Sequence, residues 1–381
     1  MKNSFKIAVL MFITTLTAQA QEFEVFTRSI PTNSDTELVL DLNNTYVSIE
    51  TTNDNTIQFD YKVKFENYSK KSMKKIVDNI ITSIDTKGNK VIFSTNSDKK
   101  MLRLSYALNS AFSFNFDFDK NKSKDTIYKK TKLDFNKELN EALKLRLNKL
   151  LTKIRTIDAE GNETKLNLKT AKVQKSNFTI KVPAHVKITV KAKNSQIIFQ
   201  GKMAQLMDIR SEGSTINAGD LTNTKNNLRF TGGTVTIKGL TGGAYTFKDV
   251  NTIKLGKLQD IYASCEFSDL EIGEISNNVQ IKDFNSKFLI HNFSENFKAL
   301  KMLSEYSKIS MFYPTSDFSL QTYGVNTVHY TSGLKTEIAP SRSGEKSKMM
   351  LIGDPDTSKH KIELDISHGI VKLGEDYILK K

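Results

Sequence analysis

The acidic residues of the central segment are the first candidates for chemistry, because two carboxylates can act as acid and base on a glycosidic bond. On the local alternation of apolar and polar residues they fall at turns and on outward positions, and they form no single column. We therefore predict a non-enzymatic protein, with a carbohydrate-active enzyme as the least favoured alternative. The eight acidic residues are Asp208, Glu212, Asp220, Glu266, Asp269, Glu271, Glu274 and Asp283.

Other reactive residue types give equally little sign of a catalytic centre. The five histidines show no metal-ligand spacing such as H-x-H or H-E-x-x-H, so we expect surface or turn histidines, no metal and no cofactor. Gly232-Gly233 and Gly242-Gly243 lack the phosphate-loop pattern, and turns with positive φ explain them more simply. The single cysteine, Cys265, falls on an inward position and is expected to be a buried, unreactive thiol.

The elements that would position these residues follow from a short pattern that returns through residues 186–330. Each unit has two alternating apolar residues, a polar or glycine turn, and a second such pair, which is typical of strands with one buried face. The units recur about every 19 residues, in the range of stacked coils. We therefore predict an all-β protein, a single-stranded, parallel, right-handed β-solenoid with a helix-containing insertion. The first-strand residues are Ile188, Ile209, Leu228, Tyr245, Ala263, Val279, Leu300 and Leu320.

Residues 1–20 read as an export signal. A basic start precedes a short apolar run, and Ala18-Gln19-Ala20 fits a small-x-small cleavage site, with Gln21 as the first mature residue. No later apolar stretch is long enough to cross a bilayer. We expect an exported protein, in the periplasm, on the outer-membrane surface or secreted.

A strongly basic insertion interrupts the strand pattern at residues 99–172. From Lys99 to Arg155 it holds 15 Lys and Arg against 6 Asp and Glu, in a chain of formal charge +14. It contains an alternating Phe112–Phe118 strand and an amphipathic helix near 136–154. Its cations either keep the helix soluble or contact an anionic polysaccharide, an envelope polymer or a surface protein, rather than a nucleic acid. The candidate contact residues are Lys129, Lys130, Lys132, Lys144, Arg146 and Lys149.

The remaining segments complete the expected organisation. Residues 21–98 predict an N-terminal β unit with a short helix over Met73–Ile81, capped by Ser69 or Ser72 and suited to cover an open end of the stack. The coils occupy 173–332, and a loop with capping strands occupies 333–381. The oligomeric state is left open.

Two motifs resemble the adhesin family of exported bacterial β-solenoid proteins, which is similar to the heads of autotransporter adhesins. The motifs are Ile180-Lys181-Val182-Pro183 leading into the coils, and a closing Ile362-Glu363-Leu364 with Gly369-Ile370. The Ala-Gln-Ala-Gln ending of the signal peptide resembles those of Bacteroidetes-type bacteria. The resemblance implies a non-enzymatic, adhesin-like binding module at the cell envelope. The alternative is a structural or sensory envelope protein that docks a partner through the basic insertion.

Overall fold

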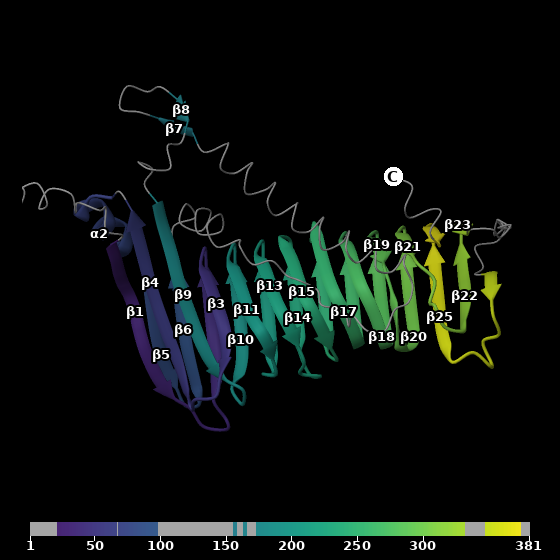
Figure 1. The fold of residues 1–381 in the computed structure, drawn as a ribbon, viewed down its shortest axis with the longest axis horizontal. Helices are drawn as coiled ribbons and strands as arrows, with labels where there is room; N and C mark the ends of the chain where they lie inside the picture. The colour runs from purple at the N-terminus through teal and green to yellow at the C-terminus, as the bar shows by residue number, and fades with distance from the viewer. Residues whose placement is uncertain are drawn as a thin grey trace, which may run out of the picture.

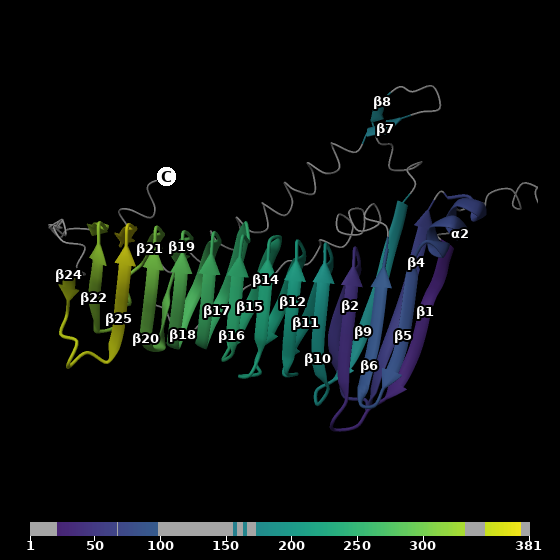
Figure 2. The ribbon, with the colours of Figure 1, turned by 180° about the vertical axis from the view of Figure 1, so that it is seen from behind.

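The computed structural model describes residues 21–66, 68–97, 155–157, 163–165, 173–331 and 347–374. Their strands succeed one another along the long axis of the molecule, from the N-terminal strands at one end to the C-terminal strands at the other (Figure 1). The view from behind shows the same succession (Figure 2). The predicted signal peptide up to Ala20 and nearly all of the basic insertion, with its six candidate cations, lie outside the described residues.

The N-terminal unit combines parallel and antiparallel pairing. β1 pairs antiparallel with β4, β4 with β9, and β5 with β6. A separate two-stranded sheet joins β7 (Arg155–Ile157) and β8 (Glu163–Lys165). The N-terminal elements are β1 (Gln21–Pro31), β2 (Glu37–Asn43), β3 (Tyr46–Thr52), β4 (Thr56–Glu66), α2 (Lys70–Asp78), β5 (Ile81–Lys87), β6 (Lys90–Asn96) and β9 (Val173–Pro183).

The central strands form two rows of parallel neighbours. One row runs β2–β10–β12–β14–β16 and the other β3–β11–β13–β15. Both rows meet on β17, which pairs with β15 and β16. The central strands are β10 (Lys187–Lys193), β11 (Gln196–Met203), β12 (Met207–Glu212), β13 (Thr215–Leu221), β14 (Asn227–Thr231), β15 (Thr234–Thr241), β16 (Ala244–Lys248), β17 (Thr252–Glu266) and β18 (Asp269–Phe284).

The C-terminal strands extend the sheet and end it with an antiparallel pair. β25 lies between β20 and β22 in parallel, and β24 pairs antiparallel with β22. The strands are β19 (Lys287–Ile290), β20 (Phe293–Glu305), β21 (Lys308–Met311), β22 (Phe318–Val325), β23 (Val328–Thr331), β24 (Ser347–Ile352), β25 (His360–Ser367) and β26 (Ile370–Leu373).

The expected single-stranded, parallel, right-handed β-solenoid is wrong. The 24 strands belong to one mixed sheet that curls through 315° and so nearly closes on itself. β17 and β18 run without interruption where two separate strands were expected, and antiparallel strands stand at both ends. The reason is physical: period-two alternation reports which side chains are buried, but not the direction of the strand beside them.

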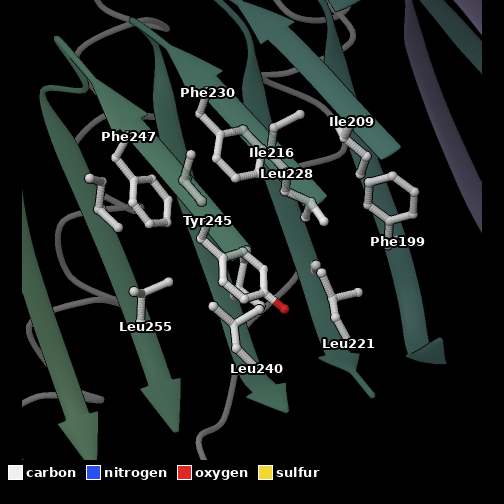
Figure 3. Close-up of a cluster of buried hydrophobic side chains, with 14 of the residues drawn as sticks. Phe199, Ile209, Ile216, Leu221, Leu228, Phe230, Leu240, Tyr245, Phe247 and Leu255 are labelled. Carbon is white, nitrogen blue, oxygen red and sulfur yellow. The ribbon is translucent and has the colours of Figure 1, made fainter. Parts of the chain in front are cut away.

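The alternation itself predicted the buried face well. Ile209, Leu228, Tyr245 and Ala263 lie on four successive neighbouring strands, each paired with the next, and all four are buried. Figure 3 shows the first three among the side chains of the core, with Phe230 and Phe247 beside them. The stacked pair Phe230–Phe247 has ring centroids 5.4 Å apart. Curling the sheet encloses these side chains in one continuous core.

The predicted N-terminal helix is present as α2. Ser69 is its N-cap, and the Ser69 side chain accepts a hydrogen bond from the backbone N–H of Ser72 at 3.3 Å. Met73 is buried, and Ile76 and Val77 pack partly buried against the core. The helix lies beside β1 and β4 at the N-terminal end of the row of strands (Figures 1 and 2). Among the described residues, no helix has the length and apolar composition needed to span a bilayer.

Candidate functional site: an aromatic strip on the turns

The turns between paired strands form a column of residues in the left-handed backbone region. At each turn one residue has a φ between 47° and 64°, and its N–H donates to a carbonyl of the neighbouring turn or strand end. This conformation favours glycine, asparagine and aspartate. The column, in the order of its backbone hydrogen bonds, is Asn44, Asn194, Gly213, Gly232, Asp249, Phe267, Asn285, Tyr306, His368 and Asn326.

Two members of this column are bulky aromatic residues. Phe267 has a φ of 48° and Tyr306 a φ of 58°, in a region that costs an L-residue roughly 1–2 kcal/mol. Neither side chain repays this cost by burial, since Phe267 is 45% and Tyr306 53% exposed. Backbone strain that packing does not explain is a physical reason to suspect a functional site.

The two aromatics belong to a continuous exposed row, which we call the aromatic strip and define as Phe267, Phe284, Tyr306 and His368. Phe284, the last residue of β18, is 39% exposed. Ring centroids are 5.4 Å apart for Phe267–Phe284 and 5.7 Å for Phe284–Tyr306, both edge to face. The rings of Tyr306 and His368 stack at 4.9 Å. The steps are close to the spacing between neighbouring strands, so the sheet itself sets the spacing of the rings.

A ladder of hydroxyl groups holds these turns from within. Ser268, Ser286 and Ser307 directly follow turn residues of the column, and all three are buried. The Ser286 hydroxyl accepts from the Ser268 N–H at 3.1 Å, and the Ser307 hydroxyl accepts from the Ser286 N–H at 3.0 Å. Since buried N–H groups need a partner, this ladder fixes each turn relative to the next. The strip therefore stands on a rigid support.

A buried carboxylate lies at the end of this ladder. Asp283 of β18 is 5% exposed and accepts hydrogen bonds from the hydroxyls of Ser304, at 2.8 Å, and of Ser307. Burial raises the pKa of Asp283, and the hydroxyl hydrogen bonds offset only part of this effect. Asp283 was expected on an outward or turn position, and that expectation is wrong.

Three acidic residues of β18 face outward, as expected, in pairs across the strands. Asp269 pairs with Lys287 at 3.3 Å and Glu274 with Lys257 at 3.4 Å. Burial opposes ionisation of Glu271, yet its pKa is lowered, because His291 and Lys254 hold the carboxylate at 3.1 and 3.0 Å. Such partners make these acids parts of ion pairs rather than poised catalytic groups.

The histidines and Cys265 also find structural places. His185 contacts the Thr32 hydroxyl at 3.1 Å, and His360 contacts the Phe297 carbonyl oxygen. His329 is buried, against the expectation of a surface position, and burial lowers its pKa. No group of three potential metal ligands occurs among the described residues.

The prediction for Cys265 is confirmed in its burial. It is 3% exposed and paired along the sheet with Asp283. Burial, with a smaller effect of the Asp283 charge, raises the pKa of its thiol. The turn glycines are confirmed as well, with φ of 64° and 76° at Gly232 and Gly233. Of the cleavage-site residues only Gln21 is described, as the exposed first residue of β1.

The sequence analysis missed the aromatic strip, although a signal for it was present. Turn tripeptides such as Glu212-Gly213-Ser214 align with Glu266-Phe267-Ser268 and Glu305-Tyr306-Ser307. The second and third triplets place an aromatic residue where the first has glycine. That substitution marks a position at which the side chain, rather than the turn, accounts for the residue.

The fold and the strip together define an all-β protein with a rigid, exposed row of aromatic side chains. No protein-family model matches the chain, and no curated protein matches it. Solved structures similar to it include a proposed cell adhesion protein from Clostridium sporogenes (10% identity, 93% of this chain and 99% of that one, TM-score 0.21). Others are a proposed adhesin from Bacteroides fragilis (7%, 94% and 98%, 0.31) and a proposed lipid-binding protein from Parabacteroides distasonis (12%, 92% and 96%, 0.29). At such TM-scores the likenesses carry no argument, and we infer function from the side chains.

Proposed function

We propose that the protein is a non-enzymatic, adhesin-like binding module of the bacterial envelope that holds an extended polysaccharide along the aromatic strip. The observation that carries this proposal is the placement of Phe267 and Tyr306. Both are exposed and bulky, and both occupy a strained backbone position that glycine or asparagine would fill at lower cost. A ligand that stacks on the rings gives this arrangement a purpose.

The chemistry of the strip fits a sugar chain. Exposed aromatic rings offer flat apolar surfaces to the C–H faces of sugar rings, and nearby amides and imidazole offer hydrogen bonds to hydroxyl groups. Asn285 and Asn326 are exposed turn residues of the same column, and the Asn326 amide contacts the His368 ring at 3.2 Å. The strip follows the column of turns, so it suits a linear ligand better than a compact one.

Rigidity supports the same function. Because the hydroxyl ladder fixes the turns beneath the strip, little conformational freedom is lost when a ligand binds. The outward acids of β18 are held in ion pairs, which supports recognition rather than hydrolysis. The basic insertion remains a proposed second contact with an anionic partner.

The test is a glycan and envelope-polymer array probed with the chain from Gln21 onward. The test variant is Phe267→Asn/Tyr306→Asn, which installs a residue that the same column already uses. The matched control is Tyr262→Thr/Leu303→Thr, which removes two other exposed apolar side chains, 45% and 42% exposed, from strand positions. We expect saturable binding that the control keeps and the test variant loses. Equal binding by both variants, or no binding by the wild type, would contradict the proposal.

A further inference from the structure

The opposite end of the molecule carries a second surface that the aromatic strip does not explain. α2 presents Lys70, Lys71, Lys74 and Lys75, all exposed, on the side away from its buried Met73. The spacing i, i+1, i+4, i+5 places the four ammonium groups on one face of the helix. Together with Asp78 and Asn79 they line a shallow, open hollow.

These lysines lack the partners that the other cations have. Lys187 and Lys254 pair with Glu37 and Glu271, whereas none of the four helix lysines forms an ion pair with a described carboxylate. Asp78 is the only acidic residue of the helix. A face with four positive charges and one negative charge attracts an anionic partner.

An exposed apolar side chain follows directly after this basic face. Ile81, the first residue of β5, is 67% exposed, the largest value among the exposed large hydrophobic residues of the described segments. The preceding residue, Ile80, is buried, and its N–H donates to the Val77 carbonyl at 2.9 Å, so the chain leaves the helix in a fixed direction. Lysines around a projecting aliphatic residue are the composition of a surface that lies in a membrane interface.

From these observations we infer that α2 and Ile81 dock the protein onto an anionic phospholipid bilayer. The lysine ammonium groups contact the headgroup phosphates, and Ile81 enters the boundary between headgroups and acyl chains. Because α2 lies at the N-terminal end of the row of strands and the strip lies on the turns after β17, the docked molecule would hold its polymer site away from the bilayer (Figures 1 and 2).

The experiment measures binding of the chain from Gln21 onward to phosphatidylcholine vesicles with and without phosphatidylglycerol. The test variant replaces the four helix lysines with glutamine. The matched control replaces Lys191, Lys225, Lys282 and Lys298, which are exposed and have no ion pair with a described carboxylate, and so makes the same change in net charge. Ile81→Ser tests the apolar contact.

We expect binding that requires phosphatidylglycerol and weakens as salt is added. Each lysine should contribute roughly fivefold, so the helix variant should bind roughly a hundredfold or more weakly, and the control much less so. Ile81→Ser should weaken binding severalfold at every salt concentration. Equal losses in helix variant and control, unchanged binding of Ile81→Ser, or equal capture of soluble heparin through the same lysines would each overturn the inference.

Discussion

The ring of Tyr306 lies parallel to the imidazole of His368, with centroids 4.9 Å apart, although the two residues are 62 positions apart in the chain. The contact arises because the Tyr306 N–H donates to the Ser367 carbonyl at 2.9 Å, which places the two turns side by side. The aromatic strip is thus a product of strand pairing. It exists only in the folded sheet.

The first prediction separates stability from binding at Phe267. Asparagine tolerates a positive φ better than phenylalanine, and the Phe267 side chain is largely exposed. We therefore expect Phe267→Asn to leave the free energy of unfolding unchanged or to raise it by about 1 kcal/mol. Urea unfolding followed by circular dichroism measures this. A loss of stability would show that the ring packs as part of the fold.

The second prediction concerns the hydroxyl ladder. Ser286→Ala removes the acceptor of the buried Ser268 N–H and should lower the free energy of unfolding by about 1–3 kcal/mol. The control is Ser83→Ala, at an exposed position of β5, which should change stability very little. Thermal unfolding of both variants decides the matter. Equal stabilities would mean that the ladder does not hold the turns.

The third prediction is a pH dependence from Asp283. Its folded-state pKa is raised, so the folded protein holds this proton to a higher pH than the unfolded chain. Its contribution is fully present below the unfolded pKa and is lost as pH rises through the folded pKa.

Asp283→Asn removes this ionisation and keeps an acceptor for the Ser304 and Ser307 hydroxyls. The variant should gain about 1 kcal/mol over the wild type at neutral pH and much less below about pH 4. Unfolding midpoints across this range test the sign. A variant less stable than the wild type at neutral pH would show that the charged carboxylate stabilises the fold.

The sequence predicted the buried face of the sheet but not its topology. Alternation identified Ile209, Leu228 and Tyr245 as inward, because burial in a strand has a period of two residues. It could not show that β24 runs antiparallel to β22, because the direction of a neighbour leaves no mark on that alternation. The strip escaped notice for a related reason: its rings are distant in sequence and meet only through the register of the strands.

The fourth prediction tests the close approach of two turns at Gly233. Its φ is 76°, and a Cβ there would lie 1.9 Å from the Ser214 carbonyl oxygen. Gly233→Ala should therefore destabilise the protein by roughly 3 kcal/mol or more. Gly88 is the control, since its φ is 60° but a Cβ would meet nothing within 4 Å. Gly88→Ala should cost only about 1–2 kcal/mol.

The most direct test of the central claim is the affinity of a polymer selected on the array for two tyrosine variants. Tyr306→Asn removes a ring of the strip, and Tyr262→Thr removes a ring of similar exposure, 45% against 53%, from an outward strand position. Calorimetric titration should show binding about tenfold weaker for Tyr306→Asn and unchanged for Tyr262→Thr. Unchanged affinity of Tyr306→Asn, in a protein that binds the polymer, would place recognition elsewhere and contradict the account.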